Sequence, residues 1–395
     1  MMKVKPIVRS LSRSILIFLL MVITFSYAMF QGGFVSWFLF YALIPFLLYS
    51  FLLSVVPINI QNVQREIKPF HLERGDSARV TVRFQNKTWF PLLFLTVREI
   101  DMDKQMIDKL DGQLSNIFIV GWKRNFEWTY ELRNLNRGQL AFHGLEISVA
   151  DFFGWAVRNR TVSDVQTFTV YPKLTHLKYQ PIQMQFDHGG IESSVSIVKD
   201  TSMVTGIRDY QAGDRFSWIH WKSFAKNETL RTKEFEDRTS QHTFLCIDRT
   251  VAYNFEEIVD LAASILQSVV KNQGDISFLS YGLTRSYFPN IKTQSQFQKV
   301  IQHLATVQPD ANETIYTILT KELKNLSAAT FLFITSNFSE EMSHFFTKGT
   351  SVMRGAICFV VTDGNVIIKR NYPNLKVIHI GREQFQNAFT EVVKP

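Results

Sequence analysis

Cysteine is scarce in this chain of 395 residues, which contains two, Cys246 and Cys358. Two cysteines do not make the disulfide framework that holds small secreted domains together. Each lies inside a short apolar run that has the character of a buried strand. We therefore expect buried free thiols in a reducing compartment. The length predicts two or three domains and a sizeable core.

Charge is absent from a long N-terminal stretch, because no Asp, Glu, Lys or Arg occurs between Arg13 and Arg65. The tripeptide 31–33 divides this stretch into two apolar segments, residues 14–30 and 34–56. Each is close to the ~20 residues that cross a bilayer core as a helix. A cleaved signal peptide is the competing interpretation. The second segment and the lack of an A-x-A-like site argue against it.

The net charge of +8 is unevenly distributed along the chain. Half of it comes from four basic residues ahead of the first apolar segment: Lys3, Lys5, Arg9 and Arg13. Residues 1–58 are therefore expected to form a transmembrane hairpin with both ends on the cytoplasmic side. The soluble domains are then cytoplasmic parts of a two-helix protein of the cell membrane. The remaining charge excess is mild, so nucleic acid is not an expected partner. The lipid bilayer is an expected partner because of the two apolar segments.

The common glycine-rich phosphate-binding motifs, G-x-x-x-x-G-K-[ST] and G-x-G-x-x-G, are missing, so nucleotide binding is not expected. Residues 173–205 read as a polar linker with weak periodicity. Within it, the sequence DHGG at 187–190 falls short of any specific metal or phosphate spacing.

Residues 59–172 show the alternation typical of strands. Valine and phenylalanine share one face of residues 78–85, and turn-forming residues separate the segments. The other predicted strands are 93–98, 126–132, 138–142, 145–149 and 167–171. This pattern predicts an all-β sandwich of the immunoglobulin-like kind. It lacks the Cys–Trp–Cys spacing of antibody domains.

Residues 206–236, called here the signature segment, hold the densest mixture of charged and aromatic side chains. Asp214 is expected to be the N-cap of a short helix over 216–225. Trp218 and Trp221, three residues apart, would share one face of that helix. Residues 230–235 are expected to form a strand.

From residue 242 the pattern alternates between strand and helix, which predicts an α/β domain with a mostly parallel sheet. The expected strands are 242–248, 275–281, 330–335, 356–361 and 376–380. The expected helices are 254–271, 294–307, 313–326, 340–347 and 383–393. The signature segment and this domain together occupy residues 206–395.

The signature segment resembles the family called domain of unknown function 58, through the patterns G-x-R-x-Y-x-x-G-D, I-H-W-K and E-F-E. The stretches RGQLAFHG, DFFGW and VYP before it also fit that family. The resemblance is to membrane-anchored bacterial proteins. It implies a von Willebrand factor A-like fold for the α/β domain. It also implies work with a MoxR-like AAA+ ATPase and a transglutaminase-like membrane protein, in an adaptor or chaperone-like role.

The von Willebrand resemblance also implies a place for Mg²⁺, held through D-x-S-x-S and residues of later loops. Asp248 and Thr250 fit the first two ligand positions. Ala252 stands where the second serine would be, and Asn337 follows Ser336 where a carboxylate would be. We expect a degenerate site, with no metal and no cofactor.

Three functions stay open at this stage. The favoured one is a non-enzymatic adaptor whose contact residues lie in the signature segment: Arg208, Tyr210, Gly213, Asp214, His220, Trp221, Lys222 and Glu234. In it, Arg208, Asp214 and a buried Trp221 would fix the segment onto the α/β domain, leaving His220 and Lys222 for a partner. The first alternative is a hydrolase using Asp214 and His220, since histidine transfers protons near neutral pH. The second is a Mg²⁺-dependent ligand-binding module.

Overall fold

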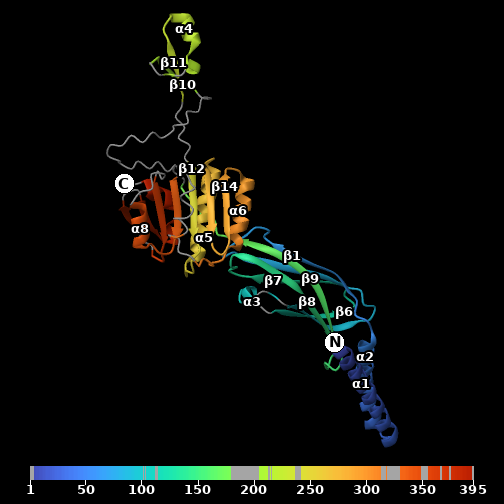
Figure 1. Ribbon diagram of the computed structural model, residues 1–395. Coiled ribbons are helices and arrows are strands. Elements are labelled where there is room, and N and C mark those ends of the chain that lie inside the picture. Colours follow the sequence, from blue (N-terminus) through green and yellow to red (C-terminus); the bar gives the residue numbers. More distant parts are fainter. Residues whose placement is uncertain are drawn as a thin grey trace. The chain divides into compact units, whose positions relative to one another are not determined.

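The computed structural model describes residues 4–100, 102, 104–111, 114–178, 204–211, 214, 216–235, 242–312, 317, 330–347, 355–364, 367–372 and 375–393. The chain divides into two compact units (Figure 1). The first holds Met1–Lys173 with Gln302–Val307, and the second holds Leu174–Ile301 with Gln308–Pro395. Most of the predicted linker, including its DHGG sequence, and all but one residue of the predicted helix 313–326 lie outside the described residues.

Two long helices open the first unit, α1 (Val4–Gln31) and α2 (Phe34–Val55). Both are long and apolar enough to cross a membrane. They pack side by side through rings, with centroids 6.0 Å apart for Phe18 and Phe51 and 5.7 Å apart for Phe25 and Phe40. The expected hairpin of apolar helices is therefore present, although α1 begins ten residues before the predicted segment.

Two sheets follow the helices within residues 60–171, and their strands pair antiparallel except for β2–β9; the short helix α3 (Lys104–Ile107) lies in the same region. One has the order β1-β3-β7-β5, from Ile60–Lys68, Ala78–Asn86, Asn125–Leu132 and Leu110–Asp111. The other has the order β2-β9-β8-β4-β6, from Leu72–Glu73, Val157–Tyr171, Gly138–Ala150, Leu92–Ile100 and Ser115–Gly121. Alternate residues of both sheets, such as Val82 and Ile147, enter one hydrophobic cluster. The predicted β-sheets are present, and the sandwich and its immunoglobulin-like topology stay predictions.

Strand β8 corrects one prediction, because residues 138–142 and 145–149 belong to a single strand rather than to two. Its pairing with β9 shifts register between Phe142 and Gly144. A β-carbon at Gly144 would lie 2.6 Å from the carbonyl oxygen of Val162, so this close approach suits glycine. The glycine that reads as a break in the sequence is an irregularity within a continuous strand.

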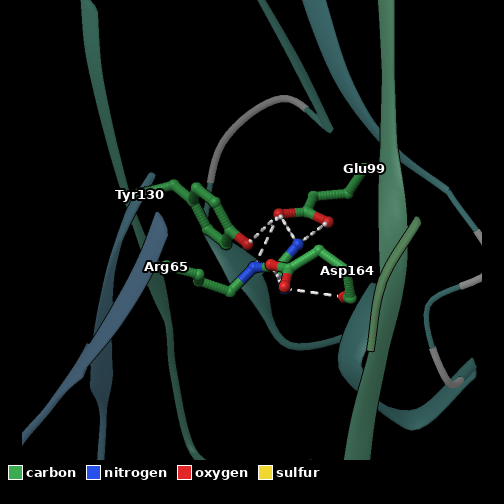
Figure 2. Close-up of polar contacts among 4 residues, drawn as sticks. All are labelled: Arg65, Glu99, Tyr130 and Asp164. Atoms are coloured by element: carbon green, nitrogen blue, oxygen red, sulfur yellow. Dashed lines mark hydrogen bonds and ion pairs between the residues drawn. The ribbon is translucent and has the colours of Figure 1, made fainter. Parts of the chain in front are cut away.

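Four polar residues meet inside the first unit (Figure 2). The guanidinium of Arg65, fully buried, lies 3.0 Å from carboxylate oxygens of both Glu99 and Asp164. The hydroxyl of Tyr130 donates to Glu99 at 2.8 Å, and Arg65 also lies over the ring of Phe142. Burial raises the pKa of Glu99, although Arg65 and Tyr130 oppose this effect. The ion pair thus joins β1, β4 and β9 through the core.

The second unit contains a seven-stranded sheet with the order β14-β13-β12-β15-β16-β18-β17. Five neighbouring strands run parallel: β13 (Asp275–Tyr281), β12 (His242–Asp248), β15 (Thr330–Thr335), β16 (Gly355–Val361) and β18 (Leu375–Ile380). Each residue of β15 is buried, as expected for a central strand covered on both faces. The described helices of the α/β domain after residue 242 are α5 (Phe255–Lys271), α6 (Gln294–Thr306), α8 (Glu340–Thr347) and α9 (Ala388–Val393). The mostly parallel α/β domain is confirmed.

Two edge strands of this sheet were not predicted. They are β14 (Arg285–Ile291) and β17 (Ile368–Tyr372), and both pair antiparallel. The predicted closing helix 383–393 is also divided, into a 3₁₀ helix over Arg382–Asn387 and then α9. The core strands and α5 lie within one or two residues of the predicted bounds.

Candidate interaction site

The signature segment forms a small hairpin of its own (Figure 1). Strand β10 (Val204–Asp209) pairs antiparallel with β11 (Arg231–Phe235). Between them come a 3₁₀ turn, η1 (Phe216–Trp218), and the helix α4 (Trp221–Asn227). Ile219, which is 3% exposed, bridges to Thr232 and ties this connection to the hairpin. Strand β10 begins before the signature segment and was not predicted.

Asp214 joins the parts of this hairpin. Its Oδ1 accepts from Arg208 Nη2 of β10 at 2.7 Å. Its Oδ2 accepts from the backbone N–H of Gln211 at 3.0 Å and from the hydroxyl of Thr232 on β11 at 3.1 Å. These bonds, led by that from Arg208, lower the pKa of Asp214 to about 2. The carboxylate is therefore ionised at neutral pH and engaged through both oxygens.

The predicted capping role of Asp214 is wrong. The helix begins at Trp221, and His220 is its N-cap: the Nδ1 of His220 accepts from the backbone N–H of Ser223 at 3.2 Å. Asp214 lies six residues before this cap and bonds to the two strands instead. His220 was expected to have no structural role, and the structure gives it one. The neutral imidazole then carries its proton on Nε2.

Trp221 was expected to be buried, and it is 60% exposed. Its ring meets the edge of Phe224 on the same helix, with centroids 6.3 Å apart. Phe216 is 75% exposed. Trp218 belongs to η1 rather than to the helix of Trp221, so the predicted shared helical face does not exist. We call Phe216, Trp221 and Phe224 the aromatic surface of the signature segment.

The other predicted residues surround this framework. Tyr210 donates its backbone N–H to the carbonyl of Leu230 at 3.0 Å, which closes the hairpin after β10. Lys222 is exposed on α4. Glu234 lies on β11 opposite Gly206, and its side chain is outside the described part of the structure. Gly213 is also outside the described residues. Sequence reasoning missed Thr232, since its partner Asp214 lies 18 residues away.

The degenerate metal position lies at the carboxyl end of β12. Asp248 is buried; its Oδ1 accepts from the N–H of Thr250 at 2.9 Å and its Oδ2 from the hydroxyl of Thr335 at 2.7 Å. Thr335, which was not predicted to be part of this position, thus occupies one carboxylate oxygen of Asp248. The half-buried Ser336 is the next residue in the chain. Among the described residues, no group of three or more His, Cys, Asp or Glu side chains is arranged to hold a metal ion. Asp248 thus has hydrogen-bond partners within the protein.

Arg249, next to Asp248 in the chain, is bound by groups of other loops and strands. Its guanidinium lies 2.6 Å from Asp310 and donates to the carbonyl of Gln308 at 3.1 Å and to the hydroxyl of Ser280 at 3.3 Å. Burial, with Asp248 nearby as a second cause, raises the pKa of the Cys358 thiol well above its ordinary value. Cys246 and Cys358 are both buried and neither forms a disulfide, as expected.

Comparison with known proteins identifies a family and a relative that matches most of the chain. The model of the family described as "Protein of unknown function DUF58" matches residues 206–357. A Bacillus subtilis (strain 168) protein, "Uncharacterized protein YeaD", is 35% identical over 335 residues, which cover 84% of each chain. Among solved structures, a von Willebrand factor type A protein from Catenulispora acidiphila gives a TM-score of 0.24 at 6% identity, covering 41% of this chain and 38% of that one. A CARDB domain from Pyrococcus furiosus gives a TM-score of 0.19 at 17% identity, covering 29% of this chain and 91% of that one. Scores of this size do not establish a shared fold. The sequence matches do establish the family, and the chain belongs to the DUF58 family.

Proposed function

We propose that this protein is a membrane-anchored adaptor that binds a partner through the aromatic surface of its signature segment. One observation carries the proposal: Phe216 and Trp221 are exposed, while Arg208, Asp214 and Thr232 of the same hairpin bond to one another. Tryptophan and its aromatic neighbours are the side chains that most often dominate binding energy at protein interfaces. A hairpin that holds large rings in water, on a scaffold fixed by Asp214, is suited to contact rather than to catalysis.

The partner that the family resemblance suggests is a MoxR-like AAA+ ATPase, with a transglutaminase-like membrane protein in the same assembly. In the adaptor's role, α1 and α2 anchor the chain in the cell membrane, with both ends on the cytoplasmic side. The α/β domain, von Willebrand factor A-like in this proposal, then stands on the side where ATP is available to the partner.

Photo-crosslinking tests the contact. A benzophenone amino acid replaces Trp221 in the full chain, which is produced together with a MoxR-like ATPase from the same genome. The matched control carries the same group at Phe70, 87% exposed in the first unit. An adduct with the ATPase is expected at Trp221 and not at Phe70. Equal adducts at both positions, or no ATPase adduct at Trp221, would refute the proposed contact.

Labelling tests the topology. A cysteine at Gly33 lies in the connection between the helices, in open space with an ordinary backbone angle. It should react with an impermeant maleimide from outside intact cells. A cysteine at the exposed Asp209 should react only after the cells are opened. The reverse pattern would place the soluble units outside the cell.

A further inference from the structure

The last turns of α2 are bound to loops of the first unit. The hydroxyl of Tyr49 donates to the carbonyl of Pro91 at 3.0 Å, and its ring stacks on Phe90 at 5.2 Å. The hydroxyl of Ser50 donates to the carboxylate of Asp151, which is 2% exposed. These contacts belong to side chains on successive positions of the helix. The end of α2 is therefore fixed to the sheets rather than joined to them only through the chain.

The loop after β8, residues 151–156, runs alongside α2. Asp151 closes it by accepting from the N–H of Ala156 at 3.2 Å, and Gly154 provides a positive φ of 73°. Two phenylalanines are left outside this closed turn: Phe152 is 60% exposed and Phe153 is 46% exposed. Their rings lie 5.9 and 5.5 Å from the ring of Phe46 on α2.

The depth of Phe46 along the hairpin follows from helix geometry. The hydroxyls of Ser14 and Ser54 are hydrogen-bonded, so they mark the same level of α1 and α2, next to the last charge before the apolar stretch. Phe46 precedes Ser54 by two turns, or ~12 Å at ~1.5 Å per residue. Phe152 and Phe153 touch Phe46, so they lie well inside the apolar part of the hairpin rather than beyond its charged end.

The same end of the sheets carries two exposed tryptophans. Trp89 is 69% exposed and precedes β4, and Trp122 is 76% exposed and follows β6. The two strands meet there, because Leu92 pairs with Gly121. Three exposed basic residues accompany them: Lys87, Lys123 and Arg124. Tryptophan at the apolar boundary with Lys and Arg beside it is the composition of a membrane interface.

We propose that this end of the β-sheet unit is a second membrane-contact surface, in addition to the two helices. Phe152 and Phe153 enter the apolar edge of the cytoplasmic leaflet. Trp89 and Trp122 lie at its interface, and the basic residues face anionic headgroups. The proposal rests on the membrane anchoring by α1 and α2 proposed above. The surface contacts lipid rather than a protein partner, because the loop is continuous with a helix surface that faces hydrocarbon in that anchor.

Lipid-borne quenchers test this surface on the full chain in bilayer nanodiscs of zwitterionic and anionic lipids, some with a nitroxide on the acyl chain. A bimane label on cysteine is placed at Phe152 or, as a second reporter, at Trp122. Asn136, exposed in the turn after β7 at the far end of the strands, is the matched control. Leu39, 48% exposed in α2, reports the anchoring itself. We expect quenching at Phe152 and Trp122 to exceed that at Asn136 at least threefold.

The outcomes separate the two proposals. If Leu39 is quenched while Phe152 and Trp122 behave as Asn136 does, the contact surface is refuted and the anchoring stands. If Leu39 is not quenched, the anchoring fails and the surface fails with it. Replacing Lys123 and Arg124 by glutamine should lower quenching at Trp122 about twofold with anionic lipid and leave it unchanged with zwitterionic lipid alone. Equal loss in both lipids would refute the headgroup contact.

Discussion

Replacing Arg65 by methionine should destabilise the first unit strongly. The side chain is fully buried and lies 3.0 Å from carboxylate oxygens of Glu99 and Asp164. Methionine fills similar space without charge, so it leaves Glu99 ionised in the core with Tyr130 as its remaining donor. Breaking a buried pair in this way costs ~3–5 kcal/mol. For a unit of this size, at ~2–4 °C per kcal/mol, the melting temperature should fall by ~6–20 °C.

The matched control is Arg83→Met on the neighbouring strand β3. Arg83 also pairs with two carboxylates, Glu66 at 3.1 Å and Glu127 at 3.4 Å, but its side chain is 54% exposed. Solvent screens such exposed pairs and they stabilise the fold little, so this variant should melt within a few degrees of the parent. Thermal unfolding of the full chain in detergent, followed by tryptophan fluorescence, measures both. If Arg65→Met loses no more than Arg83→Met, the reasoning from burial is wrong.

The dependence on pH gives a second check on Arg65→Met. Burial raises the pKa of Glu99 in the folded state, and Arg65 opposes that rise. Without Arg65 the pKa should rise further. A group whose pKa is higher in the folded state than in the unfolded state contributes stability that is complete below its unfolded pKa. That stability is lost as the pH rises through the folded pKa. The loss of stability caused by Arg65→Met, relative to the parent, should therefore become smaller as the pH is lowered from 8 to 5. A second change, Glu99→Leu, should restore part of the loss at pH 8.

Four further results are expected. Asp214→Asn should speed amide hydrogen exchange in the hairpin at neutral pH, because it removes the ionised carboxylate. In the parent, the stability that this carboxylate gives the hairpin is complete above its ordinary pKa and should be lost as the pH falls toward 2. His220→Ala should speed exchange in the first turn of α4 about fivefold, from a cap worth ~1 kcal/mol, and His220→Asn should largely preserve it. Trp221→Ala should leave the melting temperature within about 1 °C of the parent, because the exposed ring stabilises little, while reducing capture of the ATPase. Millimolar Mg²⁺ should give no saturable heat in calorimetry, and an isotherm abolished by Asp248→Ala would contradict the expectation of a degenerate site.

The parts of the fold that the sequence predicts well are those whose pattern is set by burial alone. Strands β12, β13 and β15 read as short apolar runs because both of their faces are covered. The edge strands β14 and β17 are covered on fewer sides and carry mixed polar residues, and β14 also contains Pro289. Edge positions tolerate such residues, so composition gives little sign of them.

The errors in the site have a different cause, because they depend on partners distant in sequence. Asp followed by an apolar stretch is a common start of a helix, yet Arg208 and Thr232 bond Asp214 to two strands. No local sequence pattern indicates that these two residues, rather than the start of a helix, take up the carboxylate of Asp214. The buried Arg65 did leave a signal: Val63, Arg65 and Ile67 alternate on one face of β1, so the arginine occupies a position of the apolar face.

The geometry of Asp214 and His220 bears on the choice between adaptor and hydrolase. A general base is most effective when its pKa lies near the working pH. With a pKa of about 2, Asp214 is ionised at pH 7 but holds a proton too weakly to remove one efficiently. His220 has the right kind of side chain, but its Nδ1 accepts the cap bond from Ser223. To accept a substrate proton at Nε2, the ring must change tautomer and give up that bond. Use of His220 as a base at Nε2 therefore gives up the cap bond, whereas contact through Phe216 and Trp221 requires no change in the hydrogen bonds of the segment.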